Sequence, residues 1–206
     1  MARKPLEPEA LVAISRTCAD LFVRAGGSSP TVAALATEAG LAERSFYRYF
    51  PTKEDSLRPL FDDGNHAFAQ AIEAQSAEDG FGEALVHAFE RTFATSDDEQ
   101  SRAIMATVFA DPALRRVWLE ASYETAAIIR PGVARHIRAE ESAVETTVAC
   151  GQAVLFVIAG LTHMVRDGLS SSEAAAAVAR AMFGRPDIPS GAASAPRNER
   201  NINGSR

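Results

Sequence analysis

A stretch near the N-terminus carries side chains suited to binding a polyanion. Residues 31–57 read TVAALATEAGLAERSFYRYFPTKEDSL and combine a glycine turn with aromatic residues, two arginines and a lysine. Guanidinium, ammonium and hydroxyl groups are the usual hydrogen-bond donors to phosphates and to base edges. The types and spacing of these residues therefore predict a small domain that sits in a DNA groove.

Histidines and carboxylates form a second set of side chains that could do chemistry. Pairs of them lie one helical turn apart, a spacing that metal sites in helical bundles use, but no repeated Glu-x-x-His motif accompanies them. Solvated ion pairs are the favoured interpretation, and a metal-binding or catalytic bundle is the alternative. We expect no metal site, no cofactor and no enzymatic activity. The sets are Asp62 or Asp63 with His66, Glu83 with His87 and Glu90, His136 with Glu140, and His163 with Asp167.

Charge is distributed unevenly along the 206 residues, whose net charge is −6. Residues 1–58 hold eight cations against seven acids, a net of +1, whereas the remainder holds 13 cations and 20 acids, a net of −7. DNA repels an acidic surface and attracts cations. The N-terminal part is therefore the expected contact surface for a nucleic acid.

The two cysteines and the N-terminus indicate a reducing compartment. Cys18 and Cys150 are far apart, in no metal-ligand or redox spacing, and are read as small buried hydrophobes. The first ten residues, MARKPLEPEA, lack the apolar run of a signal peptide. We expect a cytoplasmic protein.

The N-terminal elements that position the basic stretch are predicted to be helices. Apolar residues at helical spacing predict a helix over 9–25, which Gly26 ends. Ser29 and Pro30 suggest the start of a second helix that runs to about residue 39, and a third is expected over 42–50.

A fourth helix is predicted to begin at Lys53. Thr52 and Asp55 have the spacing of a capping box. Pro59 would then lie seven residues into the helix, where its ring removes a hydrogen bond and clashes with the preceding turn. A kink is expected there.

The rest of the chain is also predicted to be helical, which gives an all-α fold. Pro131 should bend or divide one long helix, and residues 185–206 have the composition of a disordered tail. We expect a helix-turn-helix domain over 1–58, a helical ligand-binding and dimerisation domain over 59–184, and a tail over 185–206. The further helices are expected at about 60–76, 80–95, 98–109, 112–138, 141–167 and 171–183.

Residues 146–165 contain no charge and mimic a membrane span. Gln152, Thr162 and His163 interrupt the run, and no basic cluster or aromatic belt flanks it. A helix buried in a bundle, or at a subunit interface, is the favoured reading.

The N-terminal motifs resemble the DNA-binding head of the TetR family of transcriptional regulators. The resemblance covers roughly residues 10–60 and preserves the family's order and spacing. It rests on Phe22, Gly26, Thr31-Val32, Leu35-Ala36, Ala39-Gly40-Leu41, Tyr47-x-Tyr49-Phe50 and Lys53.

The resemblance implies roles for nine residues of the head. Thr31, Tyr47, Tyr49 and Lys53 match positions that usually contact phosphates, while Ala42, Glu43, Arg44, Ser45 and Arg48 match positions that meet base edges or adjacent backbone. Arg44 has the donors to pair with guanine, and Glu43 can accept from cytosine. Core aromatics and solvated surface charges remain the alternatives for these side chains.

Three departures from the family pattern bear on the head, and one of them is Ser56, which stands where the family often has Leu, although Leu57 follows at once. Ala42 stands where Ser or Thr commonly caps the recognition helix, which forfeits on the order of 1 kcal/mol. Gly27 replaces an aromatic residue, which should loosen the turn into the second helix.

For the body, the resemblance implies a homodimer formed by the helices at 141–167 and 171–183, and an effector site. Burial within a monomer is the alternative for these helices. The expected function is that of a ligand-responsive repressor, released from a near-palindromic double-stranded DNA operator by a small-molecule effector; an activator is the alternative. Pocket candidates are apolar residues with a few polar anchors: Phe89, Phe93, Met105, Phe109, Trp118, Tyr123, Phe156 and His163.

Overall fold

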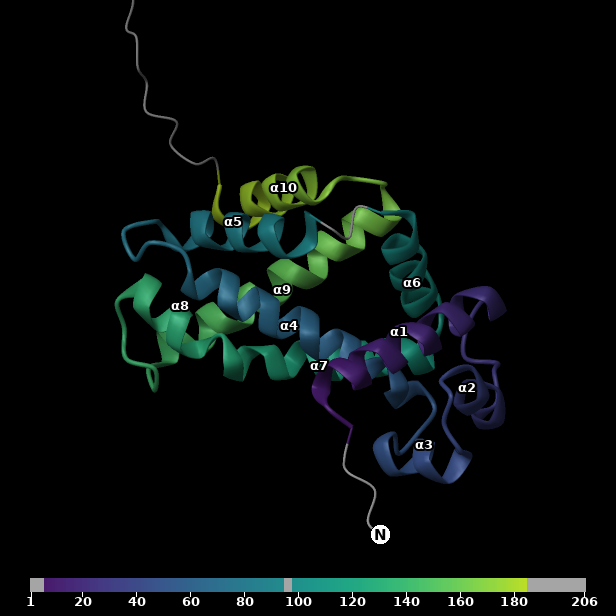
Figure 1. The fold of residues 1–206 in the computed structure, drawn as a ribbon. Coiled ribbons are helices and arrows are strands. Elements are labelled where there is room, and N and C mark those ends of the chain that lie inside the picture. The colour runs from purple at the N-terminus through teal and green to yellow at the C-terminus, as the bar shows by residue number, and fades with distance from the viewer. Residues whose placement is uncertain (1–5, 95–97, 185–206) are drawn as a thin grey trace, which may run out of the picture.

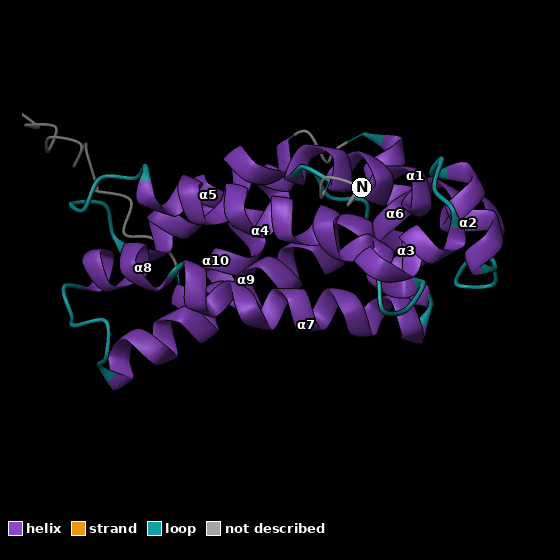
Figure 2. Ribbon diagram, turned by 60° about the horizontal axis from the view of Figure 1, so that its bottom comes forward, coloured by secondary structure: helices purple, strands orange, loops and turns teal. Residues whose placement is uncertain are grey.

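The computed structural model describes residues 6–94 and 98–184 and confirms the all-α prediction (Figure 2). Within these residues every regular element is a helix. In chain order they are α1 (Pro8–Ala25), α2 (Val32–Glu38), α3 (Glu43–Tyr49), the 3-10 helix η1 (Glu54–Leu57), α4 (Arg58–Glu73), α5 (Phe81–Phe93), α6 (Glu99–Ala110), α7 (Pro112–Ile128), α8 (Arg130–Ile137), α9 (Val144–Arg166) and α10 (Ser171–Phe183).

The helices form a small head at one end of an elongated bundle (Figure 1). Helices α2 and α3 lie at the end opposite α8, and α1 joins them to the bundle by packing on α4 and α6. Helix α4 packs against α5 and α7, and α9 packs against α7 and α10. Helix α1 therefore precedes the head helices in the chain but also packs against the bundle.

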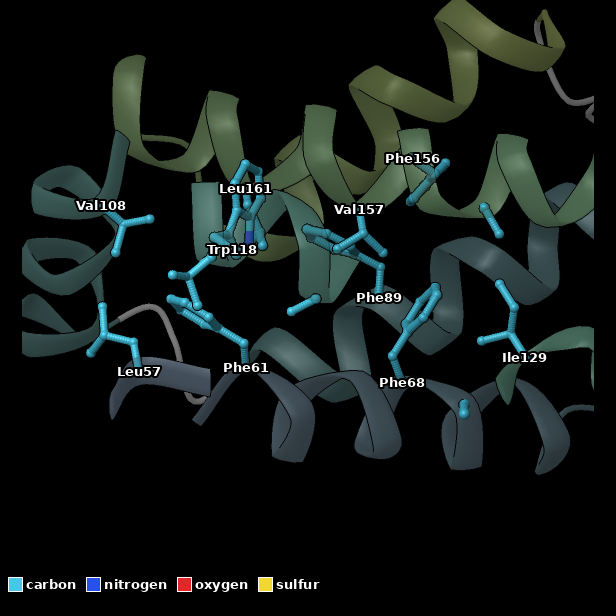
Figure 3. Close-up of a cluster of buried hydrophobic side chains, with 14 of the residues drawn as sticks. Leu57, Phe61, Phe68, Phe89, Val108, Trp118, Ile129, Phe156, Val157 and Leu161 are labelled. Carbon is cyan, nitrogen blue, oxygen red and sulfur yellow. The ribbon is translucent and has the colours of Figure 1, made fainter. Parts of the chain in front are cut away.

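Aromatic and aliphatic side chains from all parts of the bundle meet in one core. Phe61 and Phe68 of α4, Phe89 of α5 and Phe156 of α9 point into it (Figure 3). Each fully buried Phe contributes roughly 1.5–3 kcal/mol. At Gly160 of α9 a Cβ atom would lie 2.5 Å from the Phe89 ring, so any other residue there would force the ring or the helix to shift.

The start of α2 differs from the prediction. Thr31, rather than Ser29, is the N-cap residue, and its hydroxyl oxygen accepts a hydrogen bond from the backbone N–H of Ala34 at 3.2 Å. Pro30 therefore precedes the cap instead of opening the helix. Thr and Ser are nearly equivalent caps, so local sequence preferences alone did not decide between them.

The predicted kink at Pro59 is wrong. Thr52 and Asp55 do exchange the two hydrogen bonds of a capping box, at 2.9 and 3.3 Å, but the turn that follows is the 3-10 helix η1. Helix α4 begins only at Arg58, which places Pro59 in its first turn, where the missing N–H has no helical acceptor to lose. Pro131 does divide the long helix, because α7 ends at Ile128 and α8 begins at Arg130.

Both cysteines are buried, as predicted. Cys18 and Cys150 are 0% and 1% exposed, and burial raises the pKa of both thiols. Raised pKa values keep them protonated and unreactive at neutral pH. The predicted tail over 185–206 lies outside the described residues.

Candidate nucleic-acid interface and effector cavity

The turn between α2 and α3 has the geometry of a helix-turn-helix. Gly40 adopts a left-handed conformation with φ 66°, and the N–H of Leu41 bonds to the carbonyl of Ala36 at 2.8 Å. This pattern ends a helix sharply and favours glycine at the left-handed position. The chain therefore reverses within four residues and lays α3 across α2.

Two phenylalanines fix the rotation of α3 about its axis. Phe46 and Phe50 are 0% and 2% exposed, and their rings meet edge to face with centroids 4.9 Å apart. Because they lie one turn apart on the same face, the opposite face must point away from the core. That outward face carries Arg44 and Arg48, with Tyr47 beside them. Together with Ala42 and Glu43 at the start of the helix, five of the nine predicted DNA contacts are exposed on α3.

The two helices of the motif begin differently. Thr31 caps α2 through its side chain and is itself exposed, whereas Ala42 leaves the start of α3 without a side-chain cap. No side chain therefore caps the start of α3, and an anion there would bond to N–H groups of its first turn. Ser45, the next predicted contact along α3, is half-buried.

Tyr49 is tied into the head. Its hydroxyl oxygen accepts hydrogen bonds from the backbone N–H of Leu6 at 3.2 Å and from the guanidinium of Arg48 at 2.9 Å. The Arg48 guanidinium also lies 4.7 Å from the centre of the Tyr49 ring. The pair holds the start of the chain against α3 and leaves the Tyr49 hydroxyl proton to donate outward.

Lys53 supports the loop that leads into α2. Its ammonium donates to the backbone carbonyls of Ser28 and Pro30, the latter at 3.1 Å, and lies 3.9 Å from the carboxylate of Glu54. An ammonium carries three donors, so one is left to point elsewhere. Lys53 therefore has a structural role that the sequence did not indicate, beside the phosphate contact that we expected.

The bundle contains a cavity of about 660 Å³, within the usual range for small-molecule sites. Apolar side chains of α4, α7 and α9 form part of its wall, with Phe61, Trp118 and Leu161 close together (Figure 3). Its polar rim includes Arg16 and Asp20 of α1, the helix that packs against both the head and the bundle.

Three of the eight predicted pocket residues line this cavity: Phe93, Met105 and Trp118. Phe89 and Phe156 are fully buried core residues, and Phe109 packs on Trp118 with ring centroids 4.8 Å apart. Tyr123 is 79% exposed on α7. His163 bonds to Asp167 at 2.6 Å, and hydrogen bonds from Arg166 and His163 hold the pKa of Asp167 below its usual range. These five predicted residues, Phe89, Phe109, Tyr123, Phe156 and His163, do not line the cavity.

Sequence reasoning missed most of the lining. Leu60 and Phe61 directly follow Pro59, where a kink was expected, and Arg16 and Asp20 lie on a helix that was assigned to the head alone. The spacing of Arg16 and Asp20, one helical turn apart, was the available signal. Further lining residues include Asp63, Asn65, Arg102, Ile104, Ser122, Val157, Leu161 and Met164.

Most of the histidines interact with groups of their own or a neighbouring helix. His163 meets Asp167, His66 bonds to the backbone carbonyl of Asp62 at 2.7 Å, and His136 bonds to the carbonyl of Ile72 at 3.2 Å. Over residues 6–94 and 98–184, no three His, Cys, Asp or Glu side chains gather as metal ligands would.

A family model for bacterial regulatory proteins of the tetR family matches residues 15–57. This region belongs to the tetR family. The match runs from within α1 to the end of η1 and includes the whole helix-turn-helix, so the TetR-type head is a DNA-binding domain of transcriptional regulators.

Solved structures with the TetR fold match nearly the whole chain. A tetR-family transcriptional regulator from Streptomyces coelicolor aligns with a TM-score of 0.55 and 13% identity over 85% of this chain and 80% of that one. FadR from Bacillus subtilis, solved with stearoyl-CoA, aligns with a TM-score of 0.53 and 18% identity over 87% of this chain and 100% of that one. These similarities show that bundle and head together have the fold of TetR-family regulators.

No curated protein matches the sequence. By length and composition α9 is the one helix in the described part of the chain that could cross a membrane, and 44% of its most apolar window is buried in the fold. Like the core helix of a bundle, α9 is buried on one side.

Proposed function

We propose that the protein is a homodimeric repressor that binds a near-palindromic operator and releases it when a small molecule occupies the cavity. The observation that carries this proposal is the shared helix α1, which packs in the head and also supplies Arg16 and Asp20 to the cavity rim. A ligand can shift DNA binding only if it favours one arrangement of head and bundle over the other. Because α1 lines the cavity, a ligand bound there can change how the head is arranged relative to the bundle.

The outward face of α3 enters the major groove in this proposal. Arg44 and Arg48 read base edges, Thr31 and Tyr47 hold phosphates, and a phosphate completes the start of α3 beside Ala42. The head meets the regulatory bundle at about Arg58, where α4 begins. The protein acts in the cytoplasm, without enzymatic activity, cofactor or membrane.

The dimer forms through α9 and α10. Val144, Val148 and Leu155 lie on one side of α9 and are 75%, 57% and 56% exposed. Apolar residues that recur along one face of a helix are typical of a surface that a partner covers. A second copy that packs there would place two heads side by side for two half-sites.

Selection of DNA fragments with the full-length protein tests the proposal. A recovered duplex with two inverted half-sites, bound more weakly as salt rises, is the expected result. Placing the duplex in a reporter promoter then separates the modes, because a repressor lowers expression and an activator raises it. A protein that recovers only random sequence with no salt dependence contradicts the proposal.

The ligand expected in the cavity is an apolar molecule with a polar group, since the wall is apolar and the rim polar. The B. subtilis FadR structure holds stearoyl-CoA, which has both characters. Thermal-shift screening of amphipathic compounds, followed by their effect on DNA binding, tests this expectation. A compound that stabilises the protein without weakening DNA binding argues against its being the effector.

A further inference from the structure

Asp111 lies where the bundle touches the head. It follows α6 and caps α7: its Oδ1 atom accepts hydrogen bonds from the backbone N–H groups of Ala113 and Leu114 at 2.8 and 3.2 Å. Its Oδ2 atom accepts a hydrogen bond from the backbone N–H of Ser28, in the loop before α2, at 2.7 Å. One oxygen of this carboxylate thus bonds to the start of α7, and the other bonds to Ser28, 83 residues earlier in the chain.

Gly27 makes room for this contact. Its φ is +144°, a conformation that favours glycine, and a Cβ atom there would lie 2.9 Å from Oδ2 of Asp111. Gly27, where the sequence suggested a loose turn, is instead buried, and the carboxylate bonds to the next residue. The departure from the family's aromatic residue therefore has a structural reason.

The contact is also better placed to hold head and bundle together than the surface ion pair between α1 and α4. Partial burial raises the pKa of Asp111, but hydrogen bonds from Ser28, Leu114 and Ala113 outweigh it and hold the pKa at about 2. The bond to Ser28 is therefore charge-assisted at neutral pH. By contrast, the ion pair of Arg16 with Asp63 has 64% and 57% exposed side chains and a distance of 4.0 Å, and such surface pairs contribute little.

Asp111 is connected to the cavity as well. Two residues before it, Phe109 packs on Trp118, which lies in α7 and lines the cavity. Helix α7 in turn begins at the cap that Asp111 provides. A shift of α6 or α7 around a ligand would therefore move the carboxylate that holds the loop before α2.

We propose that Asp111 is a positioning residue that couples the loop before α2 to the cavity wall at Trp118. This inference rests on the proposed function, because it concerns how DNA binding and the cavity influence each other. Coupling between two sites is reciprocal, so DNA can serve as the probe in place of an unidentified effector. DNA binding must then alter the surroundings of Trp118.

Trp118 is the only tryptophan of the chain, so tryptophan emission, excited at a wavelength that tyrosine does not absorb, reports on the cavity wall. The probe is a duplex selected by the wild-type protein; anisotropy of a labelled copy measures binding, and tryptophan emission with an unlabelled copy measures the response. The wild type should bind and change its emission on saturation. In Asp111→Asn the amide oxygen still caps α7, but an NH₂ group faces the Ser28 N–H.

Asp111→Asn should lose most of the emission change and bind the duplex about fivefold more weakly, at the lower end of usual coupling strengths. The matched control is Glu83→Gln, which removes an exposed carboxylate in the first turn of α5 and should retain the full change. A full emission change in Asp111→Asn overturns the proposal. The proposal is also overturned if the wild-type protein binds DNA and its tryptophan emission does not change. That outcome would leave the proposed function intact.

Gly27→Ala provides a second variant if Asp111→Asn fails to fold. It keeps the carboxylate and the cap of α7 but crowds Oδ2, so it should lose the emission change as well. Retention of the full change in a folded Gly27→Ala protein also overturns the proposal. A wild type that binds no duplex at all removes the proposed function, and the coupling with it.

Discussion

Two exposed faces of the molecule differ in chemistry. The outward face of α3 is polar and basic, with Arg44, Tyr47 and Arg48, whereas the exposed face of α9 is apolar, with Val148 and Leu155. Phosphate contacts release counterions and weaken as salt rises, while burial of apolar surface does not depend on such release. Exposure alone therefore does not identify the partner of a face. The salt dependence of binding distinguishes the two faces, because only contacts with phosphates weaken as salt rises.

The largest expected effect comes from the apolar face. Leu155→Arg should dissociate the dimer, because it places a charge where a second copy packs. DNA affinity should then fall by about 100-fold, the smaller end of what linked binding sites gain. Analytical ultracentrifugation measures the first effect and fluorescence anisotropy the second.

The control for this variant is Leu119→Arg on α7. Leu119 is 43% exposed and should leave both quantities unchanged. If Leu119→Arg dissociates the dimer and Leu155→Arg does not, the interface lies on α7.

The next effect concerns base reading by α3. Arg44→Ala should reduce the preference at a single base pair by about tenfold, since a bidentate contact contributes about 1–3 kcal/mol of discrimination. Repeating the DNA selection with the variant measures this. An unaltered sequence profile would make Arg44 a solvated surface charge.

Lys53 distinguishes a phosphate contact from a structural one. If it touches DNA, Lys53→Met should weaken binding about fivefold and lower the slope of log affinity against log salt by about one. Arg91→Met, an exposed cation on α5, is the control with the same loss of charge. If Lys53→Met lowers the stability of the head but leaves the salt slope unaltered, the role of Lys53 is only structural, through the carbonyls of Ser28 and Pro30.

A smaller effect is expected from the N-caps of the two head helices, because Thr31 caps α2 through its side chain and Ala42 cannot cap α3. Ala42→Ser should stabilise the unbound protein by about 0.5–1 kcal/mol, and Thr31→Ala should destabilise it by a similar amount. Urea unfolding measures both. Ala33→Ser, in the exposed first turn of α2, controls for serine itself, and an equal gain there would show that capping is not the cause.

The last prediction concerns acid stability. The folded pKa of Asp111 is about 2, below its unfolded value of about 3.9. Its ionisation therefore stabilises the fold above about pH 4, and this contribution is lost as the pH falls toward 2. Asp111→Asn should flatten the decline of unfolding temperature over that interval, and a decline as steep as that of the wild type would contradict the assigned pKa.

Local features of the fold were predictable from sequence. Gly26 and Gly40 end helices with left-handed residues, and Phe46 and Phe50 set the rotation of α3, because spacing within one helix determines all of these. The errors arose where two local rules competed. Pro59 opens a helix instead of kinking one, since the 3-10 turn before it delays the start of α4.

The cavity and the Asp111 contact depend on residues distant in sequence. Arg16 of α1 and Leu161 of α9 line the same cavity, and Asp111 meets a loop 83 residues earlier. No periodicity along one helix predicts which of its residues face a void between six helices. The predicted pocket residues Phe89 and Phe156 have the right chemistry, yet they fill the core beside the cavity.

The apolar face of α9 also has a consequence for the protein inside a cell. A chain without its partner would display this face to chaperones and proteases, which act on exposed apolar surface, so single chains would be degraded faster than pairs. The concentration of pairs follows the square of the concentration of single chains. If the proposed dimer forms through this face, a modest fall in synthesis would give a disproportionate fall in DNA-bound pairs, and the valine and leucine residues of α9 would set how steeply the response depends on protein concentration.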